Sequence, residues 1–280
     1  MIGTDDGLIQ ITENSGKTWR KIDNIPDAPE QSYVNSVYLS QHDANVIYVA
    51  FNHHKYGDFK PYIFKSSDKG NSWVSISSNL PVRGSVYSIE EDHVDSNLIF
   101  CGTEFGVFFS PDSGGSWKEL SSGLPTIAVR DIAIQRREND LVLGTFGRGF
   151  YVLDDYSVLR SVENSDMDPA AQIFDVRDAL MWEKANPLGL PGKAFQGDNF
   201  YLAENLDPVA IFTYNFDEKF ESLKSKRQKA EKKLIKESKD VSYPTYNELF
   251  DEINEAKPEL VFTIRDNKDC LLYTSDAADE

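Results

Sequence analysis

The segment NHHKYGDF, residues 52–59, gathers two histidines, a tyrosine and an aspartate in one short stretch. Histidine and aspartate side chains can bind a metal ion, transfer protons or hold a polar ligand. His53 and His54 are adjacent, so their side chains diverge on an extended chain and form a poor metal site. We expect no metal here and keep two uses open for His54 and Asp58: contact with a ligand, or hydrogen bonds to neighbouring loop backbone.

Carboxylates suggest a second chemistry, because hydrolysis of a glycosidic bond needs two of them about 5 to 9.5 Å apart. Acids near expected strand ends are Asp5, Asp6, Glu90, Glu91, Asp92, Glu104 and Asp131. No spacing selects a pair among them. We retain Glu104 and Asp131 as candidate catalytic acids, in case the chain is an enzyme.

Arginines form a third set, since Arg83, Arg130 and Arg148 occur in successive segments of similar sequence. Such arginines can converge on a carboxylate ligand, or they can tie neighbouring elements together by hydrogen bonds. We retain Arg130 and Arg148 as candidate ligand-binding residues. The segment GTFGRGF, residues 144–150, is similar to a phosphate-binding loop but lacks the lysine and the helix that such a loop requires. No cofactor is therefore expected.

Composition narrows the classes of partner. The chain of 280 residues has a net charge of −17, which disfavours nucleic acid, whose phosphates need clustered lysine and arginine. No run of about 18 apolar residues predicts a membrane span. Only Cys101 and Cys270 are present, which excludes a disulfide framework and a cysteine-based zinc site. The N-terminal residues show no signal peptide.

The elements that must position these residues repeat along the chain. The strings TENSGKTW (12–19), SSDKGNSW (66–73) and SPDSGGSW (110–117) share one pattern, and each follows two β-rich runs separated by a turn. A further strand is expected ahead of each unit, at 33–39, 85–91 and 129–135, and a fourth unit begins at 141–155. Four short strands per repeat, separated by glycine, proline, asparagine and aspartate turns, predict the blades of a β-propeller.

We expect the shared strings to be structural turns. The acid accepts turn N–H groups, the glycine takes a positive φ, and the tryptophan buries its ring between layers. Because Asn14 stands where the other copies have an aspartate, an acid–base role is disfavoured. The predicted structural residues are Asn14, Gly16, Trp19, Asp68, Gly70, Trp73, Asp112, Gly114 and Trp117.

The pattern S/T-x-D/N-x-G-x-S/T-W, present three times, resembles the Asp-box or BNR repeat of sialidases, sortilin-like (VPS10) propellers and xyloglucanase-type glycoside hydrolases. HKYGDFKPYIFKSSDKGNSW, GTEFGVFFSPDSGGSW and GTFGRGFYVLDD are similar to large secreted bacterial proteins of the glycosyl hydrolase or VPS10/BNR-repeat kind. The resemblance spans about residues 1–265. It implies a secreted, periplasmic or cell-surface location and an all-β fold in which GRGFYVLDD ends the propeller.

The expected organisation is a partial propeller of three to four blades at 1–158, a connector at 159–198, and a partial β-sandwich-like domain at 199–269. Strands are expected at 199–204, 208–216 and 259–266, and a helical insertion at 217–257 with a second helix over 245–256. Three blades cannot close a ring, so we expect a fragment.

The last residues, CLLYTSDAADE at 270–280, resemble the translation of a sequencing adapter. We therefore expect a tail with no packed role, in which Cys270 is not a native thiol.

Two functions remain open. The first is a non-catalytic module that binds a glycan, peptide or protein ligand at the rim or axis of the propeller. The second is a glycoside hydrolase whose catalytic site is incomplete in this chain. A paired-carboxylate cleft would favour the enzyme, and a basic or aromatic groove without such a pair would favour binding.

Overall fold

The computed structural model describes residues 1–162, 171–183, 207–216, 220–256 and 261–276. The chain divides into two compact units. The first contains residues 1–168 and 172–215, and the second contains 169–171 and 216–280. No helix within the described residues is long and apolar enough to cross a membrane.

Two complete four-stranded sheets form the middle of the first unit. The second sheet contains β4 (Tyr33–Leu39), β5 (Ile47–His53), β6 (Asp58–Ser66) and β7 (Val74–Ser75). The third sheet contains β8 (Val86–Glu91), β9 (Ile99–Thr103), β10 (Gly106–Ser110) and β11 (Lys118–Leu120). In both sheets each strand pairs antiparallel with the next along the chain, as in a propeller blade.

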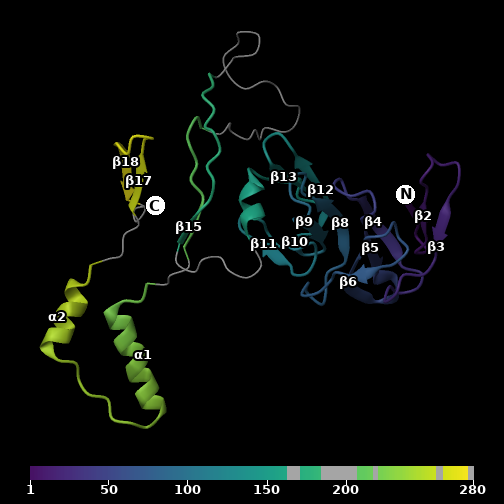
Figure 1. The fold of residues 1–280 in the computed structure, drawn as a ribbon. Helices are drawn as coiled ribbons and strands as arrows, with labels where there is room; N and C mark the ends of the chain where they lie inside the picture. Colours follow the sequence, from purple (N-terminus) through teal and green to yellow (C-terminus); the bar gives the residue numbers. More distant parts are fainter. Residues whose placement is uncertain (163–170, 184–206, 217–219, 257–260, 277–280) are drawn as a thin grey trace. The chain divides into compact units, whose positions relative to one another are not determined.

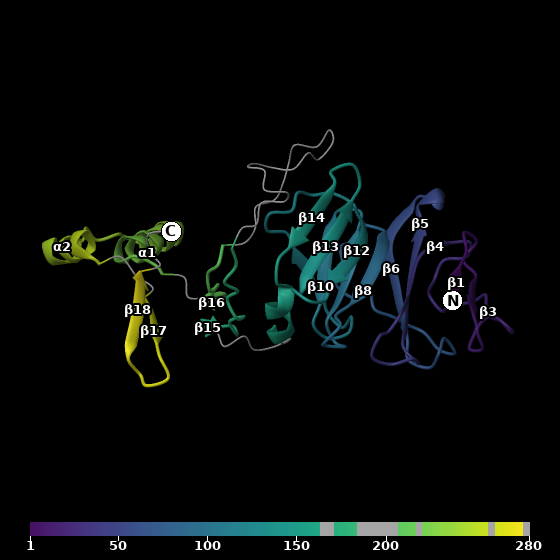
Figure 2. The ribbon, with the colours of Figure 1, turned by 90° about the horizontal axis from the view of Figure 1, so that it is seen from above.

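A three-stranded sheet flanks this pair on each side (Figures 1 and 2). The first sheet contains β1 (Ile2–Gly3), β2 (Ile9–Ile11) and β3 (Arg20–Ile22). The fourth sheet contains β12 (Val129–Gln135), β13 (Asp140–Thr145) and β14 (Phe150–Leu153), followed by the 3-10 helix η2 (Tyr156–Ser161). Strand β8, at the edge of the third sheet, contacts the edge strands β4 and β12 of the neighbouring sheets. The predicted all-β class with propeller-type sheets is confirmed.

The core lies between the sheets rather than inside them. One apolar cluster fills each of the three interfaces, and its buried members come from both neighbouring sheets. Examples are Ile9, Phe51 and Trp73 in the first interface, Ile63, Cys101 and Trp117 in the second, and Val107, Leu141 and Tyr156 in the third. Because neighbouring sheets cover both faces of β9 and β10, every residue of these two strands is buried.

The repeated strings form the turns between the last two strands of a sheet. In the third copy the Ser110 hydroxyl accepts the Gly114 N–H at 2.7 Å, and the Asp112 carboxylate accepts the Ser116 N–H at 2.8 Å. Gly114 has φ +96°, and an added Cβ would lie 2.7 Å from Ile76, so only glycine fits. We call these segments, 12–19, 66–73 and 110–117, the box turns.

The three box tryptophans do not share one environment. Trp73 and Trp117 are buried, with 9% and 4% of their surface exposed, whereas Trp19 is 43% exposed. The expectation that all three rings are buried is therefore wrong for Trp19. A box tryptophan packs against the sheet that precedes it, and the described residues place no sheet before the first one.

The remaining described elements are short. Strands β15 (Ala171–Ile173) and β16 (Tyr214–Phe216) pair with each other, as do β17 (Val261–Arg265) and β18 (Leu271–Asp276). Helices α1 (Leu223–Lys236) and α2 (Tyr246–Asn254) lie within the predicted helical insertion, and Thr245 caps α2 as expected. The predicted strand at 199–204 lies outside the described residues. Of the strand expected over 208–216, only the last three residues are strand.

Part of the segment 270–280 is a strand. Residues 271–276 pair with β17, a strand pairing that was not expected, and the absence of a packed role for this segment stays a prediction. The two strands pair through their backbones. The large apolar side chains of Leu271, Leu272 and Tyr273 are each more than half exposed. The sandwich-like domain and the domain limits remain predictions.

Candidate functional site

The hairpin turns and the inter-sheet linkers meet at one end of the sheets. The linker after β7 bonds to the second sheet, with the Gly84 N–H donating to the Phe59 carbonyl at 2.8 Å. The Glu104 N–H donates to the Ser85 carbonyl at 3.1 Å, and the Phe146 N–H donates to the Ala128 carbonyl at 2.9 Å. We call the segments 54–59, 82–87, 103–106, 128–131 and 145–149 the rim.

Successive rim turns each carry an exposed aromatic side chain. Tyr56 lies in η1 (His54–Tyr56) between β5 and β6, Phe105 lies between β9 and β10, and Phe146 follows β13. Their exposed fractions are 60%, 44% and 69%. Aromatic residues are enriched where proteins bind partners.

Two rim arginines stack on aromatic rings. The guanidinium carbon of Arg130 lies 3.7 Å from the ring centre of Tyr87 and 5.2 Å from that of Phe146. Arg83 lies 5.5 Å above the ring of Phe59. Neither arginine forms an ion pair within the described residues. A stacked guanidinium is held in place while its N–H groups stay available to an anionic ligand.

Arg148 lies at the tip of the β13–β14 turn. Gly147 and Gly149 on either side both have positive φ, and the Thr145 hydroxyl donates to the Gly149 carbonyl at 2.7 Å. The turn is therefore a tight glycine turn followed by a strand, which agrees with rejecting a phosphate-binding loop. Arg130 on β12 and Arg148 in the β13–β14 turn lie at the same end of the fourth sheet.

His54 and Asp58 are engaged by their own loop. The Asn52 side-chain oxygen accepts the His54 N–H at 3.0 Å and also contacts the His54 ring nitrogen Nδ1. The Asp58 carboxylate accepts the Tyr62 hydroxyl at 2.6 Å, which lowers the pKa of Asp58, and it accepts the Lys60 N–H at 3.1 Å. Of the two uses considered from sequence, these contacts favour the structural one.

The retained catalytic acids lie on different elements. Glu104 is in the β9–β10 turn near Tyr87 and Arg130, and Asp131 is exposed on β12. Glu90 on β8 is among the acids named from the sequence, but it was not retained as a candidate catalytic residue. Burial raises the pKa of Glu90 to about 7, and the negative charge of Asp131 adds to this rise. Only the packing of β8 against its neighbours produces this environment, so no sequence signal marks it.

At the opposite end of the sheets, Asp92 is fully buried in a polar network. Arg160 of η2 donates to both of its carboxylate oxygens at 2.8 Å, and the Tyr156 hydroxyl also donates to it. Burial alone would raise the pKa of Asp92, but these bonds outweigh it and lower the pKa to about 2. The network connects the third sheet to the segment after β14. It therefore stabilises the fold rather than facing a ligand.

A cavity of about 510 Å³ lies next to this end. It is lined by residues of 137–158, 175–182 and 207–213, including Glu138, Asp155, Arg177 and Trp182. Arg177 pairs with Glu138 at 3.2 Å. Within the described residues no group of three or more histidine, cysteine or acidic side chains is placed to hold a metal ion. The charged residues that line the cavity are mostly acidic.

Comparison with known proteins gives distant structural similarity only. No family model and no curated protein sequence matches the chain. Among solved structures, YCF48 bound to D1 peptide has a TM-score of 0.42 and 18% identity, over 55% of this chain and 46% of that one. An ancestral GH74 enzyme has a TM-score of 0.41 and 23% identity, over 51% of this chain and 20% of that one.

The GH74 xyloglucanase from Xanthomonas campestris is similar at a TM-score of 0.39 and 16% identity, over 50% of this chain and 23% of that one. The chain thus spans less than half the length of each of these proteins. Similarity at this distance assigns no activity, substrate or partner.

Proposed function

We propose that the chain is the propeller part of an Asp-box binding protein that acts outside the cytoplasm and recognises a glycan, peptide or protein ligand at the rim. The observation that carries this proposal is the stacking of Arg130 against Tyr87 and Phe146, with no ion pair to a carboxylate among the described residues, on a surface that also exposes Tyr56 and Phe105. Stacked arginine and exposed aromatic rings are the side chains that most often dominate binding free energy.

The rim chemistry fits a ligand that presents a carboxylate next to a flat or apolar surface. The N–H groups of Arg130 and Arg148 supply paired donors for the carboxylate. Phe146 and Phe105 supply faces against which a sugar ring or an apolar side chain can pack. Both ligand classes, an acidic glycan and an acidic peptide, share this chemistry.

The test is binding of the purified chain to arrays of acidic glycans and acidic peptides, followed by titration of the best ligand. Arg130→Ala should weaken binding roughly tenfold or more, since a central arginine of this kind contributes about 1.4 kcal/mol or more. Arg137→Ala is the matched control, because Arg137 is exposed and lies away from the rim. Equal affinity of the two variants and the unsubstituted chain would remove the rim from the proposal.

A second candidate is a glycoside hydrolase, favoured by one observation. Glu90, with a pKa raised to about 7, has the protonation state that a general acid needs, and Asp131 lies close enough to influence it. Turnover of a glycan that is lost in Glu90→Gln, while Arg137→Ala retains it, would favour the enzyme. The first candidate is preferred because the stacked arginine and the aromatic side chains gather on one surface.

A further inference from the structure

An apolar groove opens between the third and fourth sheets. Its volume is about 350 Å³, and it reaches the surface beside β14. Val152 and Leu153 of β14 line its edge, and the other large apolar residues that line it are Val107, Leu120, Leu124, Leu141, Leu143 and Tyr151. Leu120, Leu124 and Tyr151 are only partly buried, although they belong to the edge of the core cluster in this interface.

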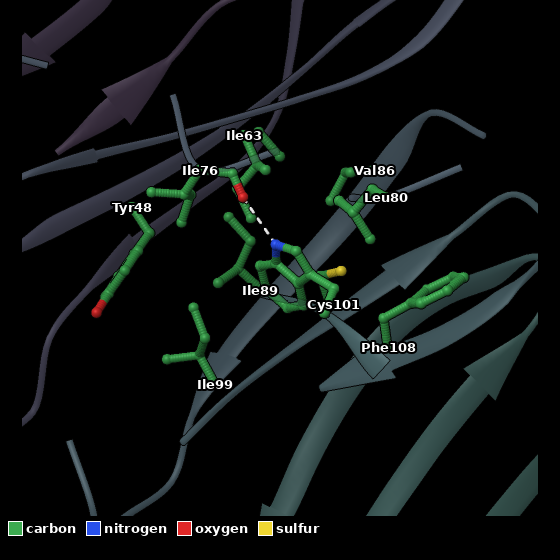
Figure 3. Close-up of a cluster of buried hydrophobic side chains, with 11 residues drawn as sticks. Tyr48, Ile63, Ile76, Leu80, Val86, Ile89, Ile99, Cys101 and Phe108 are labelled. Carbon is green, nitrogen blue, oxygen red and sulfur yellow. Dashed lines mark hydrogen bonds between the residues drawn. The ribbon is translucent and has the colours of Figure 1, made fainter. Parts of the chain in front are cut away.

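The interface between the second and third sheets has an equivalent set of apolar residues, and a tryptophan side chain occupies the space between them. Between the second and third sheets the indole of Trp117 is buried in the cluster of Figure 3, and its N–H donates to the Ile76 carbonyl at 2.7 Å. The large side chains that share this cluster include Ile63, Ile76, Leu80, Ile99, Cys101 and Phe108.

The two sets of residues correspond one to one in the repeat. Segment WVSISSNLP (73–81) aligns with WKELSSGLP (117–125), which matches Ile76 with Leu120 and Leu80 with Leu124. Strand pairing gives the rest, because Phe108 pairs with Cys101 as Tyr151 pairs with Leu143. By the same register Ile63 corresponds to Val107, and Ile99 to Leu141. The groove is therefore a tryptophan site whose tryptophan is not among the residues around it.

The sequence after β14 explains why no tryptophan of the fourth sheet enters the groove. In the alignment of β10 with β14, Leu153 stands at the position of Ser110, so the hydroxyl that accepts the box glycine N–H is missing. The chain enters η2 instead of a box turn, and Arg160 stands at the position of Trp117. Arg160 bonds to Asp92 and so cannot fill the groove.

The strand next to the groove also has an open edge. Within the described residues β14 pairs with β13 alone, whereas β10 of the third sheet pairs on both sides. Its side chains are exposed, at 80% for Phe150, 55% for Val152 and 41% for Leu153. An exposed apolar edge of this kind accepts an added strand through its free backbone N–H and C=O groups.

We propose that the β14 edge and this groove together form an acceptor for an extended segment of a partner polypeptide that carries a tryptophan. The segment pairs with β14 as β11 pairs with β10, and its indole enters the groove with the N–H directed at the Leu120 carbonyl. The occupant follows from the two filled interfaces, where a box turn with its tryptophan and following strand takes this position. The acceptor is separate from the rim and does not depend on the proposed ligand there.

The probe is a fluorescein-labelled peptide with the sequence of residues 110–122, SPDSGGSWKELSS, titrated with the full chain and followed by anisotropy. Saturable binding is expected, and replacing the peptide tryptophan by alanine should weaken it roughly tenfold or more. Leu153→Glu, which places a charge at the mouth of the groove, should weaken binding to a similar degree. Leu39→Glu is the matched control, because Leu39 is 52% exposed and lies outside the groove.

Hydrogen exchange distinguishes strand addition from loose adsorption. The bound peptide should slow exchange of the outward amides of residues 150–153, and Arg130→Ala in the rim should change neither the protection nor the affinity. Absence of binding, equal affinity for Leu153→Glu and Leu39→Glu variants that melt like the parent chain, or equal affinity of the alanine peptide would each overturn the proposal. Self-association of the chain that Leu153→Glu abolishes would assign the groove to a second copy and overturn the partner assignment.

Discussion

The interfaces on the two sides of the third sheet use equivalent apolar positions but are closed by different chemistry. Between the second and third sheets, an indole fills the outer part of the interface and donates to Ile76. Between the third and fourth sheets, the corresponding residue is Arg160, which reaches the other end of the interface and pairs with the buried Asp92. An apolar ring thus closes the interface between the second and third sheets, and a buried ion pair closes the interface between the third and fourth sheets, where the groove lies.

The difference begins at one hydroxyl and one glycine. Ser110 and Gly114 form the box turn that returns the chain as β11 and carries Trp117 inward. Leu153 and Ser157 at the matching positions cannot form that turn, so the chain continues into η2. Local turn chemistry therefore decides whether a sheet has its fourth strand, while the apolar positions of the interface stay the same.

The largest effect that should break this comparison is loss of the indole. Trp117→Ala should lower the free energy of unfolding by about 3–5 kcal/mol, the usual cost of removing a buried tryptophan. Trp19→Ala is the matched control, since Trp19 is 43% exposed, and should cost less than about 1 kcal/mol. Urea unfolding of the two variants measures the difference. Similar losses would show that burial in the second interface does not distinguish the two tryptophans.

The ion pair of the other interface should give the next largest effect. Arg160→Met should cost about 2–3 kcal/mol at pH 7, because it leaves the buried Asp92 carboxylate without its cation. The loss should be smaller than the roughly 3–5 kcal/mol typical of a broken buried ion pair, because the Tyr156 hydroxyl and the N–H groups of Val94 and Asp95 still donate to Asp92.

The pH dependence sharpens this result. The folded-state pKa of Asp92 is lowered to about 2, below its unfolded value of about 3.9. Its contribution is therefore fully present above about pH 4 and is lost as the pH falls toward 2. The difference in unfolding free energy between the parent chain and Arg160→Met should shrink over this window. A difference that is constant from pH 7 to pH 2 would contradict the assignment of the effect to Asp92.

Much of this fold could be predicted from the sequence, because turns and strand alternation are local signals. The three box turns, the strands at 33–39 and 129–135 and the helical insertion all follow from residue types at fixed spacing. The exposure of Trp19 could not be predicted in this way, because it depends on whether a sheet precedes the first one. The tryptophan-shaped groove required the register of β13 and β14, since Leu143 and Tyr151 lie on separate strands.

Less of the candidate site could be predicted, because its contacts join residues that are far apart in the sequence. Arg130 was identified from its place in the repeat, but its stacking on Tyr87 and Phe146 joins three segments of the chain. The residue types of His54 and Asp58 made them candidate ligand-binding residues, but their hydrogen bonds are to nearby residues of the same hairpin. The shifted pKa of Glu90 arises from packing of neighbouring strands, which no short motif encodes.

The smallest expected effect tests whether the box aspartate has any role beyond the turn. In the parent chain the Ser116 N–H lies 2.8 Å from an Asp112 carboxylate oxygen. In Asp112→Asn the side-chain amide oxygen can still accept this N–H. The new amide can donate to the Ser116 hydroxyl, which reverses its role from donor to acceptor. The first box turn already has this arrangement, since Asn14 accepts the Thr18 N–H at 2.9 Å and donates to the Thr18 hydroxyl at 2.8 Å. The change should therefore cost less than about 0.5 kcal/mol in urea unfolding, whereas Asp112→Ala, which removes the bonds from Ser116 and from the Ser110 hydroxyl, should cost about 1–2 kcal/mol. Equal losses for the asparagine and alanine variants would show that the negative charge, rather than the hydrogen-bond pattern, holds the box turn.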